Sequence, residues 1–279
     1  MTRAAAALLA AVALLPACTD GPTASVASTR IVLQVSSRGG GSVPGSYASL
    51  PAWTLYDDGR VIWEARRAPS TGVGPLLDDL RSATVSAEDV RRIADGAREA
   101  GVDGVARDYG ELPVWDAGTT VFVLHTDRGR VANAVYALEM APETGTPEND
   151  ARRTLHELFR HLLDLDGWLG EGTLRDEEPY EPEAFALYAR RMEGEYERRY
   201  RTPWRGPAFA AGEDTPAGLC TVLTGETLEK VWPDITKANV LTVWVTDDGD
   251  WSFRPRQLLP GESTCADGTA VAEVTAPAP

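Results

Sequence analysis

Three segments of this chain alternate apolar and polar residues on both sides of a short turn sequence, which is the pattern of an antiparallel hairpin. They are residues 53–63, turning at Asp58-Gly59, residues 120–136, turning near Asp127-Arg128-Gly129, and residues 241–253, turning at Asp248-Gly249. The pair Asp58-Gly59 predicts a type I′ turn. Residues 31–36 (IVLQVS) alternate in the same way and predict a further strand. A chain with these patterns is expected to build antiparallel sheet.

Apolar residues at helical spacing predict three helices between these strands. The first follows a capping box at Ser86 and Asp89, and the second begins near Pro147. The third runs from about Glu226 and contains Pro233, which must kink or split it. The predicted fold class is therefore α+β, with antiparallel hairpins packed with three or more helices.

The acidic, proline-containing stretch 176–183 is the best candidate for a domain boundary. It would separate a hairpin/helix α+β unit, residues 31–175, from a small disulfide-closed C-terminal α/β unit, residues 183–265. Residues 183–200 alternate like a strand at first and then repeat tyrosines at helical spacing, so we expect a strand passing into a helix. Residues 266–279 are small and proline-containing, and predict a disordered tail.

The N-terminus has the pattern of a bacterial lipoprotein signal. Arg3 supplies the positive charge, and the apolar run 4–15 is too short for a membrane-spanning helix, which needs about 20 apolar residues. Residues 14–18 (LLPAC) then match a lipobox, from which only Pro16 departs. We expect residues 1–17 to be a signal peptide, Cys18 to carry a diacylglyceryl lipid with acyl chains such as palmitate, and residues 18–30 to form a flexible tether.

This anchor predicts a lipoprotein on the outer face of the cytoplasmic membrane. The alternative is cleavage after Ala27, where Ser25-Val26-Ala27 resembles an A-x-A site, and the product would be secreted. Lipidation is favoured because the apolar run ends ahead of Cys18. The formal net charge of the chain is −15, and an acidic protein repels phosphate backbones, so nucleic acid is not an expected partner.

The chain has three cysteines, which is an odd number. If Cys18 is lipidated, Cys220 and Cys265 remain, and outside the cytoplasm these two can form a disulfide. The alternative is two free buried thiols. Neither cysteine has a second Cys or a His at ligand spacing, so a zinc site is not predicted.

No catalytic set, metal site or cofactor site stands out in the sequence. His156 and His161 are five residues apart, so on a helix they diverge by about 140° and do not reproduce the H-E-x-x-H pattern. The glycine run 39–41 matches no phosphate-binding loop. The acidic segments 164–167 and 247–250 lack the glycine and glutamate that a calcium loop requires.

An arginine-rich, aromatic stretch interrupts the otherwise acidic chain. Its arginines are Arg190, Arg191, Arg198, Arg199, Arg201 and Arg205. One interpretation is an anion-binding patch for lipid headgroups, an anionic envelope polymer or an acidic partner. The alternative is a solvated helix face on which Glu193, Glu195 and Glu197 offset the charge.

Three segments resemble a group of uncharacterised actinobacterial lipoproteins: residues 31–63, residues 219–232 (LCTVLTGETLEKVW) and residues 254–265 (RPRQLLPGESTC). The resemblance spans most of residues 31–265. It implies an exported acidic ectodomain with a C-terminal cysteine pair, and it brings no assigned catalytic or binding residue. We therefore expect a non-enzymatic binding or interaction module of the cell envelope. The alternative is an extracytoplasmic hydrolase whose active site has no sequence signature.

Overall fold

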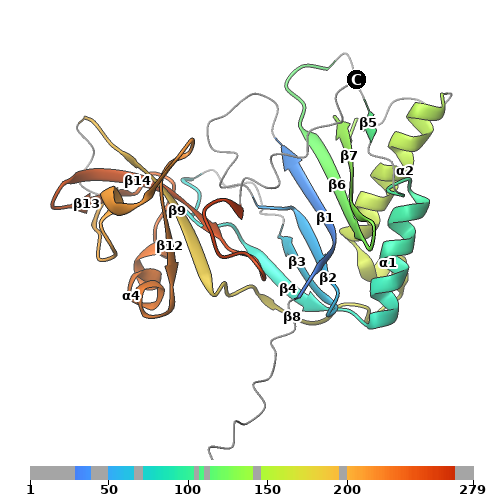
Figure 1. Cartoon of the computed structure of the whole chain (residues 1–279), viewed down its shortest axis with the longest axis horizontal. Coiled ribbons are helices and arrows are strands. Elements are labelled where there is room, and N and C mark those ends of the chain that lie inside the picture. The colour runs from blue at the N-terminus through green and yellow to red at the C-terminus, as the bar shows by residue number, and fades with distance from the viewer. Residues whose placement is uncertain are drawn as a thin grey trace, which may run out of the picture.

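The computed structural model describes residues 29–38, 50–65, 72–103, 107–109, 114–140, 146–194 and 200–267. The chain is mixed α+β and mostly sheet, and it places two sheets next to each other (Figure 1). Four α-helices and a disulfide between Cys220 and Cys265 complete the described part. The predicted signal peptide, Cys18 and most of the predicted tether and tail lie outside the described residues. Within the described ranges, no helix has the length and apolar character needed to cross a membrane.

The first sheet has eight strands in the spatial order β5-β7-β6-β1-β2-β3-β4-β8. Their bounds are β1 Ile31–Arg38, β2 Trp53–Tyr56, β3 Arg60–Glu64, β4 Leu80–Thr84, β5 Arg107–Tyr109, β6 Thr119–Thr126, β7 Gly129–Tyr136 and β8 Arg175–Pro179. Neighbouring strands are antiparallel except β5 and β7, which are parallel. The predicted strand at 31–36 and the predicted hairpins at 53–63 and 120–136 are confirmed by β1, by β2 with β3, and by β6 with β7.

The turn between β2 and β3 differs from the predicted type I′ turn. A type I′ turn needs positive φ at both central residues, whereas here only Gly59, with φ 90°, has a positive φ and Asp58 does not. The Gly59 N–H donates to the Tyr56 carbonyl at 3.1 Å. The connection therefore has three residues and only its glycine is left-handed, which is the next commonest way to close a hairpin.

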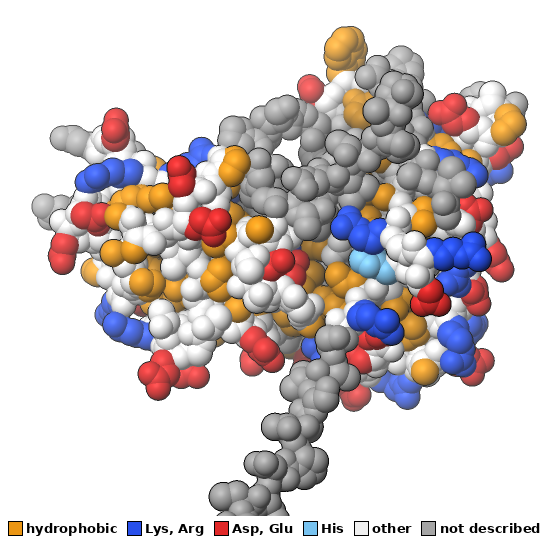
Figure 2. Space-filling view, in the orientation of Figure 1, with side chains coloured by type: hydrophobic (Ala, Val, Ile, Leu, Met, Phe, Trp, Pro, Cys, Tyr) orange, Lys and Arg blue, Asp and Glu red, His pale blue; other side chains and the backbone are white. Residues whose placement is uncertain are grey.

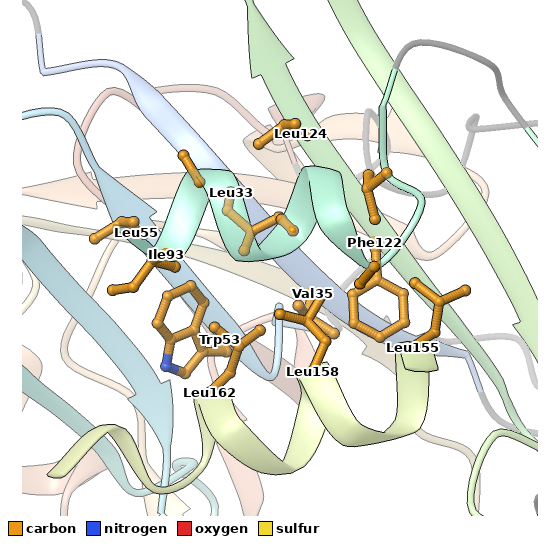
Figure 3. Close-up of a cluster of buried hydrophobic side chains, with 14 of the residues drawn as sticks. Leu33, Val35, Trp53, Leu55, Ile93, Phe122, Leu124, Leu155, Leu158 and Leu162 are labelled. Carbon is orange, nitrogen blue, oxygen red and sulfur yellow. The ribbon is translucent and has the colours of Figure 1, made fainter. Parts of the chain in front are cut away.

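Two helices cover one face of the first sheet. They are α1, Ala87–Glu99, capped by Ser86, and α2, Pro147–Leu162, capped by Thr146. Figure 3 shows the resulting core, in which side chains of both helices meet side chains of the sheet. Among them, Ile93 comes from α1, Leu155, Leu158 and Leu162 come from α2, and Leu33, Val35, Trp53 and Phe122 come from the sheet. A short helix α3, Leu165–Leu169, follows α2 because Asp164 caps a new helical turn.

The second sheet has six strands in the order β10-β13-β14-β9-β12-β11. Their bounds are β9 Ala184–Arg191, β10 Arg201–Pro203, β11 Glu213–Thr215, β12 Gly218–Thr224, β13 Val243–Thr246 and β14 Gly249–Gln257, with a 3₁₀ turn η3 at Phe209–Ala211. The helix α4, Gly225–Ile235, packs its apolar face on this sheet. It runs through Pro233, so the proline does not split it. The predicted hairpin at 241–253 is confirmed by β13 and β14. The predicted strand of residues 183–200 is confirmed by β9, while part of its predicted helix lies outside the described residues.

The two sheets meet at a small apolar junction. Tyr56, Ile62 and Leu80 of the first sheet pack with Leu259, which follows β14. The Tyr180 hydroxyl donates to the Leu258 carbonyl at 2.7 Å across the same junction. The chain passes from β8 to β9 between Pro179 and Ala184, so the first half of the predicted boundary stretch is a strand of the first sheet.

Candidate functional site

A cleft of about 970 Å³ opens beside the junction of the two sheets. Its walls are the start of β1, the β6–β7 hairpin and the segment 260–267 that follows β14. In Figure 2, blue Lys and Arg side chains gather around pale-blue histidine atoms on the right half of the visible face. His125 is the histidine among the described residues that line the cleft. The cleft is therefore a polar hollow whose lining has both signs of charge: Arg30, Arg98, Arg128 and Arg130 against Asp57, Asp103, Asp127, Glu262 and Asp267.

Strand register explains which side chains form one wall. Gln34 of β1 pairs with Val123 of β6, and His125, two residues further along β6, pairs with Arg130 of β7. Side chains two residues apart on a strand point to the same face, and so do side chains of paired residues. Gln34, His125 and Arg130 therefore share a face, and it is the face opposite the helices, because Phe122 packs in the helix-covered core.

Gln34 is the most deeply buried polar side chain of the cleft. It is 6% exposed, and its amide makes no hydrogen bond with another described residue. The amide is not among the fully buried polar atoms without a partner, so it is accessible from the cleft, where water or a ligand can bind it. Gln34 is therefore a polar group that the cleft can offer to a ligand.

Buried hydroxyl groups lie next to Gln34 on the same face of the sheet. Thr54 lies opposite Gln34 on β2, and its hydroxyl, like those of Ser36 and Tyr56, has no hydrogen-bond partner within the described ranges. Burial raises the pKa of the Tyr56 phenol well above its usual range, so the group stays a neutral hydroxyl. Buried hydroxyl groups and the apolar cluster of Tyr56, Ile62 and Leu80 therefore share this face of the sheet.

His125 is half-buried and uncharged at neutral pH. Burial lowers its pKa below the ordinary 6.5, and the positive charge of Arg130 opposite lowers it further. A neutral imidazole offers one N–H donor and one acceptor. Arg128 and Arg130 are exposed, and their guanidinium groups have no ion pair or hydrogen bond with the described residues. They are thus two cations at the cleft that no described carboxylate neutralises by direct contact.

Several carboxylates of the cleft already have partners within the protein. Asp57 accepts the backbone N–H of Arg30 at 2.9 Å and its Nε at 3.1 Å, and these bonds lower the pKa of the carboxyl. Glu262 binds Arg256 through two hydrogen bonds of 2.7 Å. Asp267 accepts the backbone N–H groups of Ser263 and Thr264 at 2.7 Å, which outweighs the opposing effect of its burial and lowers its pKa. Through these hydrogen bonds the three carboxylates hold backbone and arginine side chains of the cleft wall in place.

The disulfide holds the same wall. Cys220 on β12 and Cys265 after β14 are joined with a Cα–Cα distance of 6.1 Å, which confirms the predicted pairing. The Tyr188 hydroxyl donates to the Cys265 carbonyl at 2.8 Å. Because Glu262 and Asp267 flank this anchoring point, the cross-link fixes the segment that faces His125.

The structure separates the described members of the predicted arginine patch. Arg190 donates from Nε to the Ala217 carbonyl at 2.8 Å, and Arg205 lies 3.8 Å from the Asp234 carboxylate on α4. Arg191 donates to the Asp248 carbonyl and stands over the Trp251 ring, with 5.9 Å to its centroid.

The same hairpin turn holds Arg201, which pairs with the Asp250 carboxylate. The four described arginines thus contact three separate places rather than one surface. Arg198 and Arg199 lie outside the described residues, and anion binding by this stretch stays a prediction.

The other histidines lie on α2, away from the cleft. His161 stacks on Trp168 with ring centroids 4.9 Å apart, and His156 is half-buried. Across the described ranges, no histidine donates to or accepts from a serine hydroxyl or a carboxylate, and no three His, Cys, Asp or Glu side chains gather as metal ligands. Searches against protein-family models, curated proteins and solved structures match nothing to this chain.

Sequence reasoning did not single out Gln34, His125 or Arg130. One signal was present: Gln34 is the polar residue in the middle of IVLQVS, and His125 ends an apolar strand just before a turn. Their meeting depends on the pairing of β1 with β6, about which local patterns carry no information.

Proposed function

We propose that this chain is an extracytoplasmic binding protein, held on the outer face of the cytoplasmic membrane by a lipid on Cys18, that takes its ligand in the cleft beside His125. The lipobox and the resemblance to actinobacterial lipoproteins support the anchor. The observation that carries the binding role is Gln34, a largely buried residue whose amide has no partner among the described residues and is accessible from a cleft of about 970 Å³. The ligand is a small molecule or the end of an envelope protein or polymer.

In this proposal residues 31–175 and 183–265 form two units, and the cleft lies at their junction. Each part has its own sheet and its own buried cluster, which supports the division. The disulfide supports a C-terminal unit closed on itself, because it ties β12 to the end of the described chain. The segment 260–267 then belongs to the second unit and forms a wall against the first.

The test uses the full chain, produced in its own host and extracted from the membrane fraction with mild detergent. Native mass spectrometry is expected to show a retained ligand mass that is lost from the variant Gln34→Leu. A Cys18→Ser variant should leave the membrane fraction. A bare wild-type protein, or a retained mass indifferent to Gln34, would count against binding in the cleft.

The alternative, an extracytoplasmic hydrolase, is tested on the same material with broad activity-based probes for serine and carboxylate nucleophiles. The binding proposal expects no stoichiometric labelling. Labelling of one residue in the cleft would replace the binding role with catalysis.

A further inference from the structure

We infer that the cleft recognises a carboxylate, held between the guanidinium of Arg130 and the amide of Gln34 with the imidazole of His125 beside it. This inference rests on the proposed binding function and names the chemistry of its ligand. It concerns three side chains on adjacent strands of one sheet, and none of them was assigned a role by the sequence.

The three groups are spaced for one small planar anion. Gln34 and His125 are diagonal neighbours on β1 and β6, and such positions lie about 7–8 Å apart. A carboxylate with one hydrogen bond of about 2.8 Å on each side spans that distance. Arg130, directly opposite His125, can present two parallel N–H groups to the same carboxylate. The register therefore places three donor side chains next to one another on one face of three adjacent strands.

Charge favours a single negative charge over a double one. Arg130 has no ion pair with a described residue, and its charge disfavours a second positive charge on His125, so an anion is the ligand charge that suits these two groups. The same cleft has five acids in its walls, Asp57, Asp103, Asp127, Glu262 and Asp267, and the chain as a whole has a net charge of −15. A phosphate dianion meets twice the repulsion from these acids that a carboxylate meets. The expected ligand is therefore a carboxylic acid.

A neutral ligand would leave the positive charge of Arg130 without a counterion. The charged side chains that line the cleft around His125 are Arg30, Asp57, Arg98, Asp103, Asp127, Arg128, Arg130, Glu262 and Asp267. Burial and Arg130 together keep the imidazole uncharged, so it can donate one N–H to the anion. A carboxylate bound between Arg130 and His125 would offset the charge of Arg130, and the pKa of His125 would rise on binding.

The test follows the imidazole signals by NMR in the full-length chain held in detergent micelles. The chain has only three histidines, so the variants His156→Gln and His161→Gln assign the spectrum. The probes are sodium acetate, sodium succinate, sodium phosphate and glucose at matched ionic strength. Acetate and succinate are expected to shift the His125 signals, to raise its pKa and to leave His156 and His161 unchanged.

Variants then test whether Arg130 and Gln34 bind the carboxylate. Arg130→Gln and Gln34→Leu are expected to raise the Kd for succinate about tenfold or more, since each removes a charge-assisted or buried hydrogen bond. The matched control is Arg153→Gln, which removes an arginine paired with Asp150 at 3.2 Å on the surface of α2 and should not change the Kd. Equal losses in Arg130→Gln and Arg153→Gln would overturn the inference.

The remaining outcomes separate this inference from the proposed function. If phosphate or glucose shifts His125 while both carboxylates do not, the cleft binds a ligand but the carboxylate assignment is wrong. If no probe shifts His125 and native mass spectrometry retains a mass without a carboxyl group, the cleft again binds a ligand and the carboxylate assignment is again wrong. If no probe acts and no mass is retained, the inference and the binding function fail together.

Discussion

Arg256 and Glu262 form a doubly hydrogen-bonded ion pair that closes the turn after β14. Both hydrogen bonds are 2.7 Å long, and the Arg256 side chain is completely buried. Glu262 also accepts the Leu259 N–H at 2.7 Å, so it fixes the backbone as well as the charge. Through this pair, Leu259 reaches the apolar junction of the two sheets while Glu262 faces the cleft.

We predict that Glu262→Gln lowers the free energy of unfolding by about 3–5 kcal/mol, because it leaves the buried Arg256 charge without a counterion. The measurement is urea denaturation at neutral pH. The double variant Arg256→Met/Glu262→Leu should recover most of the loss, since it removes both charges.

The matched control for that experiment is Asp150→Asn, which breaks an ion pair with Arg153 on the surface of α2. Exposed pairs contribute about 0–1 kcal/mol, so this change should be small. Equal losses in Glu262→Gln and Asp150→Asn would show that the Arg256 pair is screened like a surface pair.

Removal of the disulfide is expected to weaken the fold without abolishing it. Cys220 and Cys265 are 45 residues apart, and the chain-entropy model assigns such a cross-link about 4 kcal/mol. The variant Cys220→Ala/Cys265→Ala should therefore unfold at lower urea concentration. Wild-type protein in the presence of a reductant should unfold at the same urea concentration as the double variant. Identical urea midpoints for oxidised and reduced wild type would contradict the prediction.

Local patterns predicted the parts of this fold whose partners are close in sequence. The hairpin of β2 and β3 pairs Trp53 with Trp63, and the capping box at Ser86 begins α1 where the sequence indicated. Both depend on contacts within about ten residues, which turn residues and caps specify directly. The same kind of signal placed β6 with β7 and β13 with β14.

The parts that sequence reasoning missed depend on distant partners. The parallel pairs β5–β7 and β10–β13, and the short strand β8, have no turn that marks them. The residues of the cleft come together because β1 pairs with β6, about ninety positions away, and position along a strand says nothing about which strand lies alongside. Arg256 was equally hidden, because an alternating RPRQ segment gives no sign that its arginine is buried.

The turn glycine Gly59 is expected to tolerate no side chain. Its φ is 90°, and a Cβ atom would lie 2.4 Å from the Val85 carbonyl oxygen. Gly59→Ala should lose about 1–2 kcal/mol from the left-handed backbone and about 1–3 kcal/mol more from the clash. Urea denaturation measures both losses together.

Gly172→Ala separates the two contributions. Gly172 has φ 80° and nothing within 4 Å of a Cβ atom, so its substitution carries the backbone cost alone. The loss in Gly59→Ala should exceed the loss in Gly172→Ala. Equal values would mean that the hairpin moves away from Val85 without cost.

The pKa of His125 provides a prediction on pH dependence. Because burial and Arg130 hold its pKa in the folded protein below 6.5, the unfolded chain binds this proton more readily. The stability that neutral His125 contributes is therefore complete above about pH 6.5 and is lost as the pH falls below that value. Urea denaturation between about pH 5 and pH 8 should show this loss, and His125→Gln should remove its His125 component.

Two arginines of the same hairpin distinguish the causes of that shift. Arg130→Gln should raise the pKa of His125 toward 6.5 without reaching it, because burial, the larger cause, remains. Arg128→Gln, in the turn two residues earlier, removes the same charge from a residue that is not paired with His125, and it should change the pKa less. NMR titration of the His125 imidazole measures both variants. An equal shift in the two variants would mean that His125 responds to the general charge of the hairpin, and the contact from β6 to β7 would then have no special role in keeping this imidazole neutral.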